Sequence, residues 1–184
     1  MEWTKFNTHG ESSNHAFEVM CNILFESWCK SEYNDHLKYF SFVNGSGGDG
    51  GVEAYATLES GEVIGVQSKW FPDKMNTNQF NQIEKSFNTA VKVRPEMIRY
   101  IVCIPRDFTS KKVVKNGKIA KNTEENSWTK LVEKLKKNRA KPISFPFSKA
   151  NITFACFFLF LCYHHISTLK HESEETKKWL KKVI

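Results

Sequence analysis

The sequence predicts an α/β fold in which a mixed central β-sheet is flanked by helices. Two observations lead to this prediction. Segments with apolar residues at helical spacing alternate with short runs that are apolar throughout or at every second position, and the elements follow the order α-β-β-β-α-β-α. The length of 184 residues suits one domain with a full core, and an apolar content of 40% excludes a disordered chain.

The first predicted elements are a helix over residues 14–30 and three strands. Apolar side chains share one face of that helix, and Ser12, Ser13 or Asn14 would cap its beginning. The predicted strands cover residues 37–43, 52–58 and 62–71. The short turn between the last two strands predicts an antiparallel hairpin.

The second half begins with a helix over residues 78–93, which ends before Pro95 because the residue preceding a proline disfavours the helical conformation. Residues 100–104 form a continuous apolar run, which is typical of a buried central strand. A further helix is expected around residues 128–135, inside the basic stretch 110–141. This stretch is either a solvated basic helix with flanking loops or a surface that faces nucleic acid.

Charge and composition narrow the functional classes. Lysine and arginine exceed aspartate and glutamate by 27 − 20 = 7, which raises the expectation of a polyanionic partner. The N-terminus lacks the basic and apolar regions of a secretory signal, and the 5 cysteines form no CxxC pair, which fits reduced thiols. The longest apolar run, residues 152–163, is too short for a membrane span, and there is no P-loop motif. We therefore expect a cytoplasmic protein without a membrane segment.

Four polar residues are placed to carry chemistry: Glu18, Asp49, Gln67 and Lys69. Gln67 and Lys69 lie two positions apart on one predicted strand, so both side chains point to the same face of the sheet. Asp49 lies in the glycine-rich turn before the preceding strand, and Glu18 would reach the same place from the first helix. Carboxylate and amide oxygens suit Mg²⁺, and a nearby lysine can orient water or neutralise charge on a phosphate. This set predicts phosphodiester hydrolysis.

The order Asp49, then Gln67-Ser68-Lys69, resembles the D…(D/E/Q)-x-K signature of the PD-(D/E)xK phosphodiesterase superfamily. The glycines around Asp49 are closest to its Mrr-type branch of restriction endonucleases. The resemblance covers about residues 12–108, including the first helix and the helix that follows the Q-x-K strand. It implies a restriction-endonuclease-like three-layer core, cleavage of double-stranded DNA with Mg²⁺ or Mn²⁺, and often action as a homodimer.

The resemblance also implies roles for individual residues. Glu18, Asp49 and Gln67 would bind the metal, and Lys69 would be the catalytic lysine. Glu53 would orient these ligands, bind a second metal or be a solvated strand residue. The lysines expected to contact DNA are Lys85, Lys111, Lys112 and Lys115.

The predicted domains are a nuclease domain over residues 1–148 and a phenylalanine-rich segment with a charged helix over residues 149–184. Similar modules begin bacterial antiphage defence proteins, where a signalling NTPase follows, so an NTPase or sensor is an expected partner. We expect a metal-dependent DNA endonuclease of restriction or antiphage defence. The alternative is a non-catalytic DNA-binding or assembly module. Gln67 favours that alternative because an amide lowers the negative charge of the site, and Gly48 stands where the branch commonly has proline.

Overall fold

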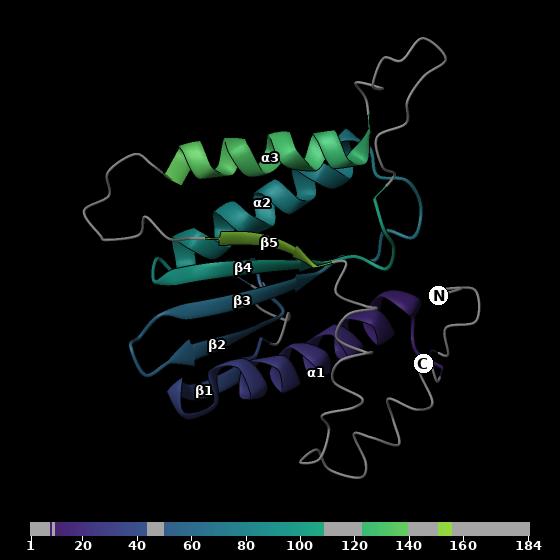
Figure 1. Cartoon of the computed structure of the whole chain (residues 1–184). Helices are drawn as coiled ribbons and strands as arrows, with labels where there is room; N and C mark the ends of the chain where they lie inside the picture. The colour runs from purple at the N-terminus through teal and green to yellow at the C-terminus, as the bar shows by residue number, and fades with distance from the viewer. Residues whose placement is uncertain (1–7, 9, 44–49, 109–122, 140–150, 156–184) are drawn as a thin grey trace.

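A computed structural model of the chain (Figure 1) describes residues 8, 10–43, 50–108, 123–139 and 151–155. The elements are α1 (Ser13–Tyr33), the 3-10 helix η2 (Asn34–His36), β1 (Leu37–Phe42), β2 (Ala54–Leu58), β3 (Val63–Ser68), α2 (Thr77–Val93), β4 (Met97–Cys103), α3 (Glu124–Arg139) and β5 (Asn151–Ala155). Up to α3, the helices and strands follow the predicted order.

The strands form one mixed sheet in the spatial order β1-β2-β3-β4-β5. β1 pairs with β2 and β2 with β3 in antiparallel orientation, whereas β3 pairs with β4 and β4 with β5 in parallel. A parallel neighbour needs a crossover connection, and α2 supplies the one between β3 and β4. The predicted α/β class with a mixed, helix-flanked sheet is confirmed.

Helices cover both faces of the sheet (Figure 1). On one face, α1 packs in a hydrophobic cluster that includes Ile64 and Val66 of β3. On the other face, α2 and α3 pack in a second cluster that includes Val63 and Val102. Since side chains alternate along a strand, Gln67 shares the α2 face with Val63, and it lies opposite Val102 in the ladder.

The predicted and observed ends of the strands differ by a few residues. β2 begins at Ala54 rather than at residue 52, because Gly50 and Gly51 form a turn with φ of +57° and +81°. Glu53 therefore precedes the strand on which it was expected. β3 ends at Ser68, so Lys69 follows that strand.

β4 begins at Met97 rather than at residue 100. The strand was predicted from the apolar run over residues 100–104. Its first residues were not predicted because Arg99 interrupts the apolar pattern. The guanidinium carbon of Arg99 lies 5.5 Å from the centre of the Trp28 ring on α1. A cation stacked on an aromatic ring can occupy a half-buried strand position.

Side-chain caps begin the first two helices. The Ser12 hydroxyl accepts a hydrogen bond from the His15 N–H at 3.2 Å, which identifies Ser12 as the cap among the three predicted candidates. α2 begins with a capping box formed by Asn76 and Gln79. These local signals set where each helix starts.

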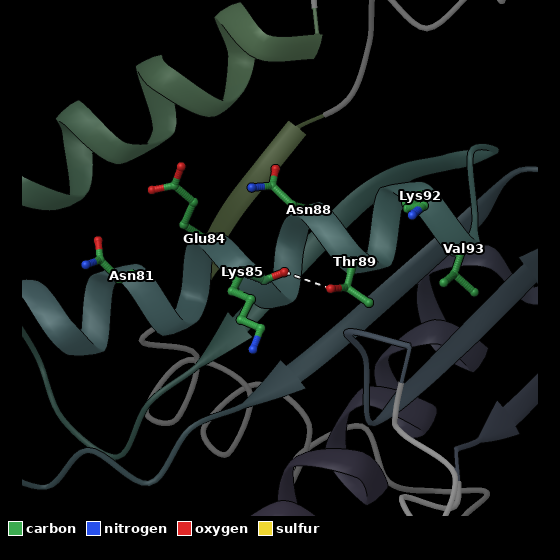
Figure 2. Close-up of a pocket in the computed structure, with 7 residues that line it drawn as sticks. All are labelled: Asn81, Glu84, Lys85, Asn88, Thr89, Lys92 and Val93. Carbon is green, nitrogen blue, oxygen red and sulfur yellow. Dashed lines mark hydrogen bonds between the residues drawn. The ribbon is translucent and has the colours of Figure 1, made fainter.

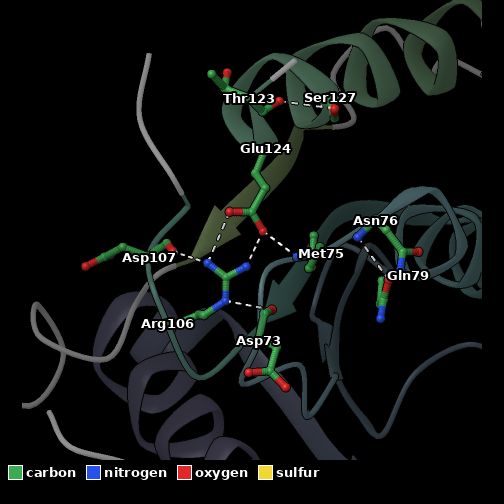
Figure 3. Close-up of polar contacts among 9 residues, drawn as sticks. All are labelled: Asp73, Met75, Asn76, Gln79, Arg106, Asp107, Thr123, Glu124 and Ser127. Atoms are coloured by element: carbon green, nitrogen blue, oxygen red, sulfur yellow. Dashed lines mark hydrogen bonds and ion pairs between the residues drawn. The ribbon is translucent and has the colours of Figure 1, made fainter. Parts of the chain in front are cut away.

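A buried ion pair joins the loops that follow β3 and β4 to the beginning of α3 (Figure 3). Glu124 pairs with the guanidinium group of Arg106 and accepts a hydrogen bond from the Met75 N–H at 2.6 Å. Arg106 also donates to the carbonyl oxygens of Asp73 at 2.9 Å and Asp107 at 2.7 Å. The Glu124 side chain is only 1% exposed. This buried cluster therefore links the segments that follow β3 and β4 to the first turn of α3.

β5 pairs with β4, so the start of the predicted 149–184 segment contributes a strand to the sheet. Residues 156–184 lie outside the described residues, and the predicted boundary at residue 148 stays a prediction. Among the described residues, no helix is both long enough and apolar enough to cross a membrane.

Candidate functional site

Glu53 and Gln67 face each other across the β2–β3 hairpin. The register pairs Ala54 with Val66, and the Glu53 N–H donates to the carbonyl oxygen of the same Val66 at 2.8 Å. The Gln67 Nε2 donates a hydrogen bond to the Glu53 Oε1. The hairpin therefore brings a carboxylate and a carboxamide into contact at the end of β3.

Gln67 is fully buried, and one of its polar atoms is left without a partner. Its exposed fraction is 0%, and its Nε2 lies 3.4 Å from the Ser68 carbonyl oxygen in addition to its contact with Glu53. Its Oε1 has no hydrogen-bond partner within the described part of the chain. An unpaired buried oxygen costs about 1–3 kcal/mol. An amide oxygen beside a carboxylate fits a hard cation, which would offset that cost.

Lys69 lies on the same face of the sheet as Gln67. Its N–H donates to the Cys103 carbonyl oxygen at 2.9 Å, which extends the β3–β4 ladder past Ser68. Because side chains alternate, Gln67 and Lys69 share one face, as the sequence predicts. Lys69 as a whole is half-buried.

Glu18 lies on α1, which covers the opposite face of the sheet from Gln67. One turn further along α1, burial raises the pKa of the Cys21 thiol, and contact with the Cys103 thiol and the charges of Glu18 and Glu53 raise it further. Both carboxylates therefore lie near Cys21. The beginning of α1 also contacts the segment after β3, since the rings of Phe17 and Trp70 are 5.4 Å apart. The beginning of α1 thus lies close to the segment that follows β3.

Other predicted site residues lie outside the described residues. They are Asp49, Lys111, Lys112 and Lys115. Their expected roles in metal and DNA binding stay predictions.

Lys85 lies in a groove of about 780 Å³ along the outer side of α2 (Figure 2). The described residues that line this α2 groove are Asn81, Glu84, Lys85, Asn88, Thr89, Lys92 and Val93. The Glu84 carboxylate pairs with Lys134 of α3 at 2.6 Å, so Lys85 and Lys92 leave the groove net positive. A groove with exposed amides and the positive charges of Lys85 and Lys92 suits phosphate groups.

The contact between Glu53 and Gln67 depends on how β2 packs beside β3 at the end of the hairpin. From the sequence, Glu53 was predicted only to orient the ligands, bind a second metal or be solvated, because a local pattern does not show which side chain it meets. Asp49 lies outside the described residues, so its expected role stays a prediction.

Comparison with protein-family models, curated proteins and solved structures gave no match. Within the described ranges, no three histidine, cysteine, aspartate or glutamate side chains converge as a metal-binding group. The case for a function therefore depends on the Glu53–Gln67–Lys69 arrangement and on the resemblance of the sequence.

Proposed function

We propose that the chain is a metal-dependent DNA endonuclease with a restriction-endonuclease-like core, of the Mrr type within the PD-(D/E)xK superfamily. One observation carries the proposal. The buried Gln67 amide contacts the Glu53 carboxylate through its Nε2, while its Oε1 has no hydrogen-bond partner in the part of the chain that the structure describes, and Lys69 follows two residues later. The order of helices and strands and the mixed sheet support the fold.

Glu53 and Gln67 would hold Mg²⁺ or Mn²⁺ through a carboxylate and an amide oxygen. Glu53 supplies the negative charge that Gln67 lacks, and we propose it as a direct metal ligand. Asp49 and Glu18 are proposed as further ligands, Asp49 from the turn before Glu53 and Glu18 from α1. When bound, such an ion lowers the pKa of coordinated water and stabilises charge on phosphate oxygens.

Lys69 is the proposed catalytic lysine. Its place two residues after Gln67 supports this role, because alternation along an extended chain would direct both side chains to one face. A lysine there can orient the attacking water or offset negative charge that develops on the phosphate. The proposed substrate is double-stranded DNA, and the proposed biological role is restriction or antiphage defence, in line with the resemblance.

The test is cleavage of supercoiled plasmid with Mg²⁺ or Mn²⁺, by wild type, Lys69→Ala and Lys74→Ala. Lys74 is an exposed lysine of the loop after β3, so its variant is a matched control for the loss of one positive charge. We expect wild type and Lys74→Ala to nick or linearise the plasmid, and Lys69→Ala or added EDTA to abolish the reaction. A folded Lys69→Ala protein that cuts at the wild-type rate would refute the assignment.

A second function is favoured by the hydrogen bond between Gln67 and Glu53. Because the Gln67 Nε2 already donates to the Glu53 carboxylate, the pair is in part satisfied without a metal. The alternative is therefore a non-catalytic DNA-binding or assembly module. It predicts salt-sensitive DNA binding without DNA cleavage. It also predicts that Mn²⁺ changes the melting temperature of wild type and of Glu53→Gln by the same amount.

A further inference from the structure

Two side chains hold the glycine turn that leads into Glu53. The Tyr100 hydroxyl donates a hydrogen bond to the Gly51 carbonyl oxygen at 2.8 Å, and the Arg94 Nη1 donates to the Gly50 carbonyl oxygen at 3.2 Å. Tyr100 comes from β4 and Arg94 from the residue after α2, so both belong to elements distant in sequence from the turn.

The turn is also pressed against α2. A Cβ atom added to Gly51 would lie 2.1 Å from the Ser86 carbonyl oxygen and 2.6 Å from the Ala90 nitrogen. Only glycine allows this approach, and the positive φ of Gly51 also favours glycine. The turn is therefore wedged between the α2 backbone and the sheet.

The two holding side chains are themselves fixed. Tyr100 is 2% exposed, and its ring meets that of Phe87 edge-on with the centroids 5.3 Å apart. The guanidinium carbon of Arg94 lies 4.5 Å from the centre of the Tyr55 ring on β2. Packing of this kind restricts each donor to one position. The hydrogen bonds from these donors then fix the positions of the Gly50 and Gly51 carbonyl groups.

We propose that Tyr100 and Arg94 are positioning residues that set the Glu53 carboxylate opposite Gln67. Glu53 follows Gly51 by two residues, and its own N–H is held by the Val66 carbonyl oxygen. The backbone on both sides of Val52 is thereby anchored. This restricts the positions that the Glu53 side chain can reach. A metal-binding group needs its ligands within about 0.5 Å of the productive geometry, and a glycine turn alone does not provide this precision.

The role of this anchor in metal binding rests on the proposed function, but its effect on the turn can be measured without metal. The variant is Tyr100→Phe, which keeps the buried ring and removes only the hydroxyl. The matched control is Tyr55→Phe, which removes a hydroxyl from the same hydrophobic cluster and keeps the ring under Arg94. Arg94→Lys is a second test variant, because it keeps the charge and changes the geometry of the donor.

The first readout is hydrogen exchange of the backbone amides over residues 50–53 in metal-free protein. We expect exchange to accelerate about threefold to tenfold in Tyr100→Phe, the factor that one net hydrogen bond supplies, and to stay at the wild-type rate in Tyr55→Phe. Arg94→Lys should act in the same direction as Tyr100→Phe. Unchanged exchange in both test variants would overturn the proposal.

The second readout is the affinity for Mn²⁺, which a merely structural role would not change in a folded variant. We expect Tyr100→Phe to bind Mn²⁺ about threefold to tenfold more weakly than Tyr55→Phe. Equal Mn²⁺ affinities together with a lower melting temperature would make Tyr100 a stabilising residue only, against the proposal. If wild type binds no Mn²⁺ through Glu53, the proposed function fails instead, and the exchange rates decide whether Tyr100 and Arg94 position Glu53.

Discussion

Replacing Gln67 by glutamate tests the candidate site at its most buried residue. Gln67→Glu keeps the size of the side chain, removes the hydrogen bond from Nε2 to Glu53 and places a second carboxylate beside the first. A hydrogen bond to a charged group contributes about 1.5–3 kcal/mol. Repulsion between the carboxylates adds to this loss, although proton uptake limits it. We expect the metal-free variant to lose about 3 kcal/mol at pH 8, or about 6–12 °C in melting temperature.

The loss in Gln67→Glu should depend on pH with a definite sign. Burial and the neighbouring Glu53 charge would raise the pKa of the new carboxyl group above the value of about 4.3 in the unfolded chain. Below that value the group is protonated in both states, and the pH-dependent cost is absent. As the pH rises, the unfolded chain releases its proton first, so the stability of the folded state falls until the raised pKa is passed.

The assay is thermal unfolding of wild type, Gln67→Glu and the control Gln82→Glu, at pH 5 and pH 8, in EDTA and in Mn²⁺. Gln82 is exposed on α2, so its variant changes the net charge equally without touching the site. Two carboxylates bind a hard cation more tightly than a carboxylate and an amide, so Mn²⁺ should stabilise Gln67→Glu more than wild type. Two outcomes would contradict this prediction. One is an equal melting temperature for Gln67→Glu and Gln82→Glu in EDTA at pH 8. The other is an equal increase in melting temperature on addition of Mn²⁺ to the two variants.

Three further predictions concern other parts of the molecule. Glu124→Ala leaves the charge of Arg106 and the buried Met75 N–H without the Glu124 carboxylate as partner. It should lower the free energy of unfolding, measured with urea, by about 3 kcal/mol, and a loss below about 1 kcal/mol would contradict the importance of this ion pair. Burial raises the pKa of Cys21, so its contribution to stability is complete below about pH 8.5 and is lost as the pH rises through the folded pKa. The urea midpoint should therefore fall in alkali for wild type and less for Cys21→Ala, and parallel curves would count against this account. Lys85→Glu and Lys92→Glu should weaken DNA binding and lower its salt dependence, whereas Lys38→Glu on β1 should do so less; equal effects would mean that the α2 groove is not a specific DNA contact.

The pattern of apolar residues was sufficient to predict the order of the helices and strands. Helical and alternating periods are properties of a local window, and the elements predicted up to α3 are present with small shifts at their ends, whereas the predicted charged C-terminal helix lies outside the described residues. Ser12 as a helix cap and the turn before β3 are also local signals. The shared face of Gln67 and Lys69 follows from alternation alone.

Site geometry was predicted less completely, because it depends on register and on packing between distant segments. Among the described residues, Glu53 is a carboxylate that meets Gln67, a contact that the local pattern did not predict, and Asp49 lies outside those residues. The position of Arg99 in β4 depends on the Trp28 ring of α1, a contact that no local window contains.

The sequence by itself determined the elements up to α3, their order and the polar residues on which a function could depend, but not the strand β5. Only the tertiary structure decided that Gln67 is buried on the α2 face, that Gly51 is wedged against α2, and that Tyr100 and Arg94 hold the turn before Glu53. The physical reason is the range of the interactions. Periodicity and capping act over a few neighbouring residues, whereas burial, close backbone approach and hydrogen bonds between distant segments exist only once the chain has packed.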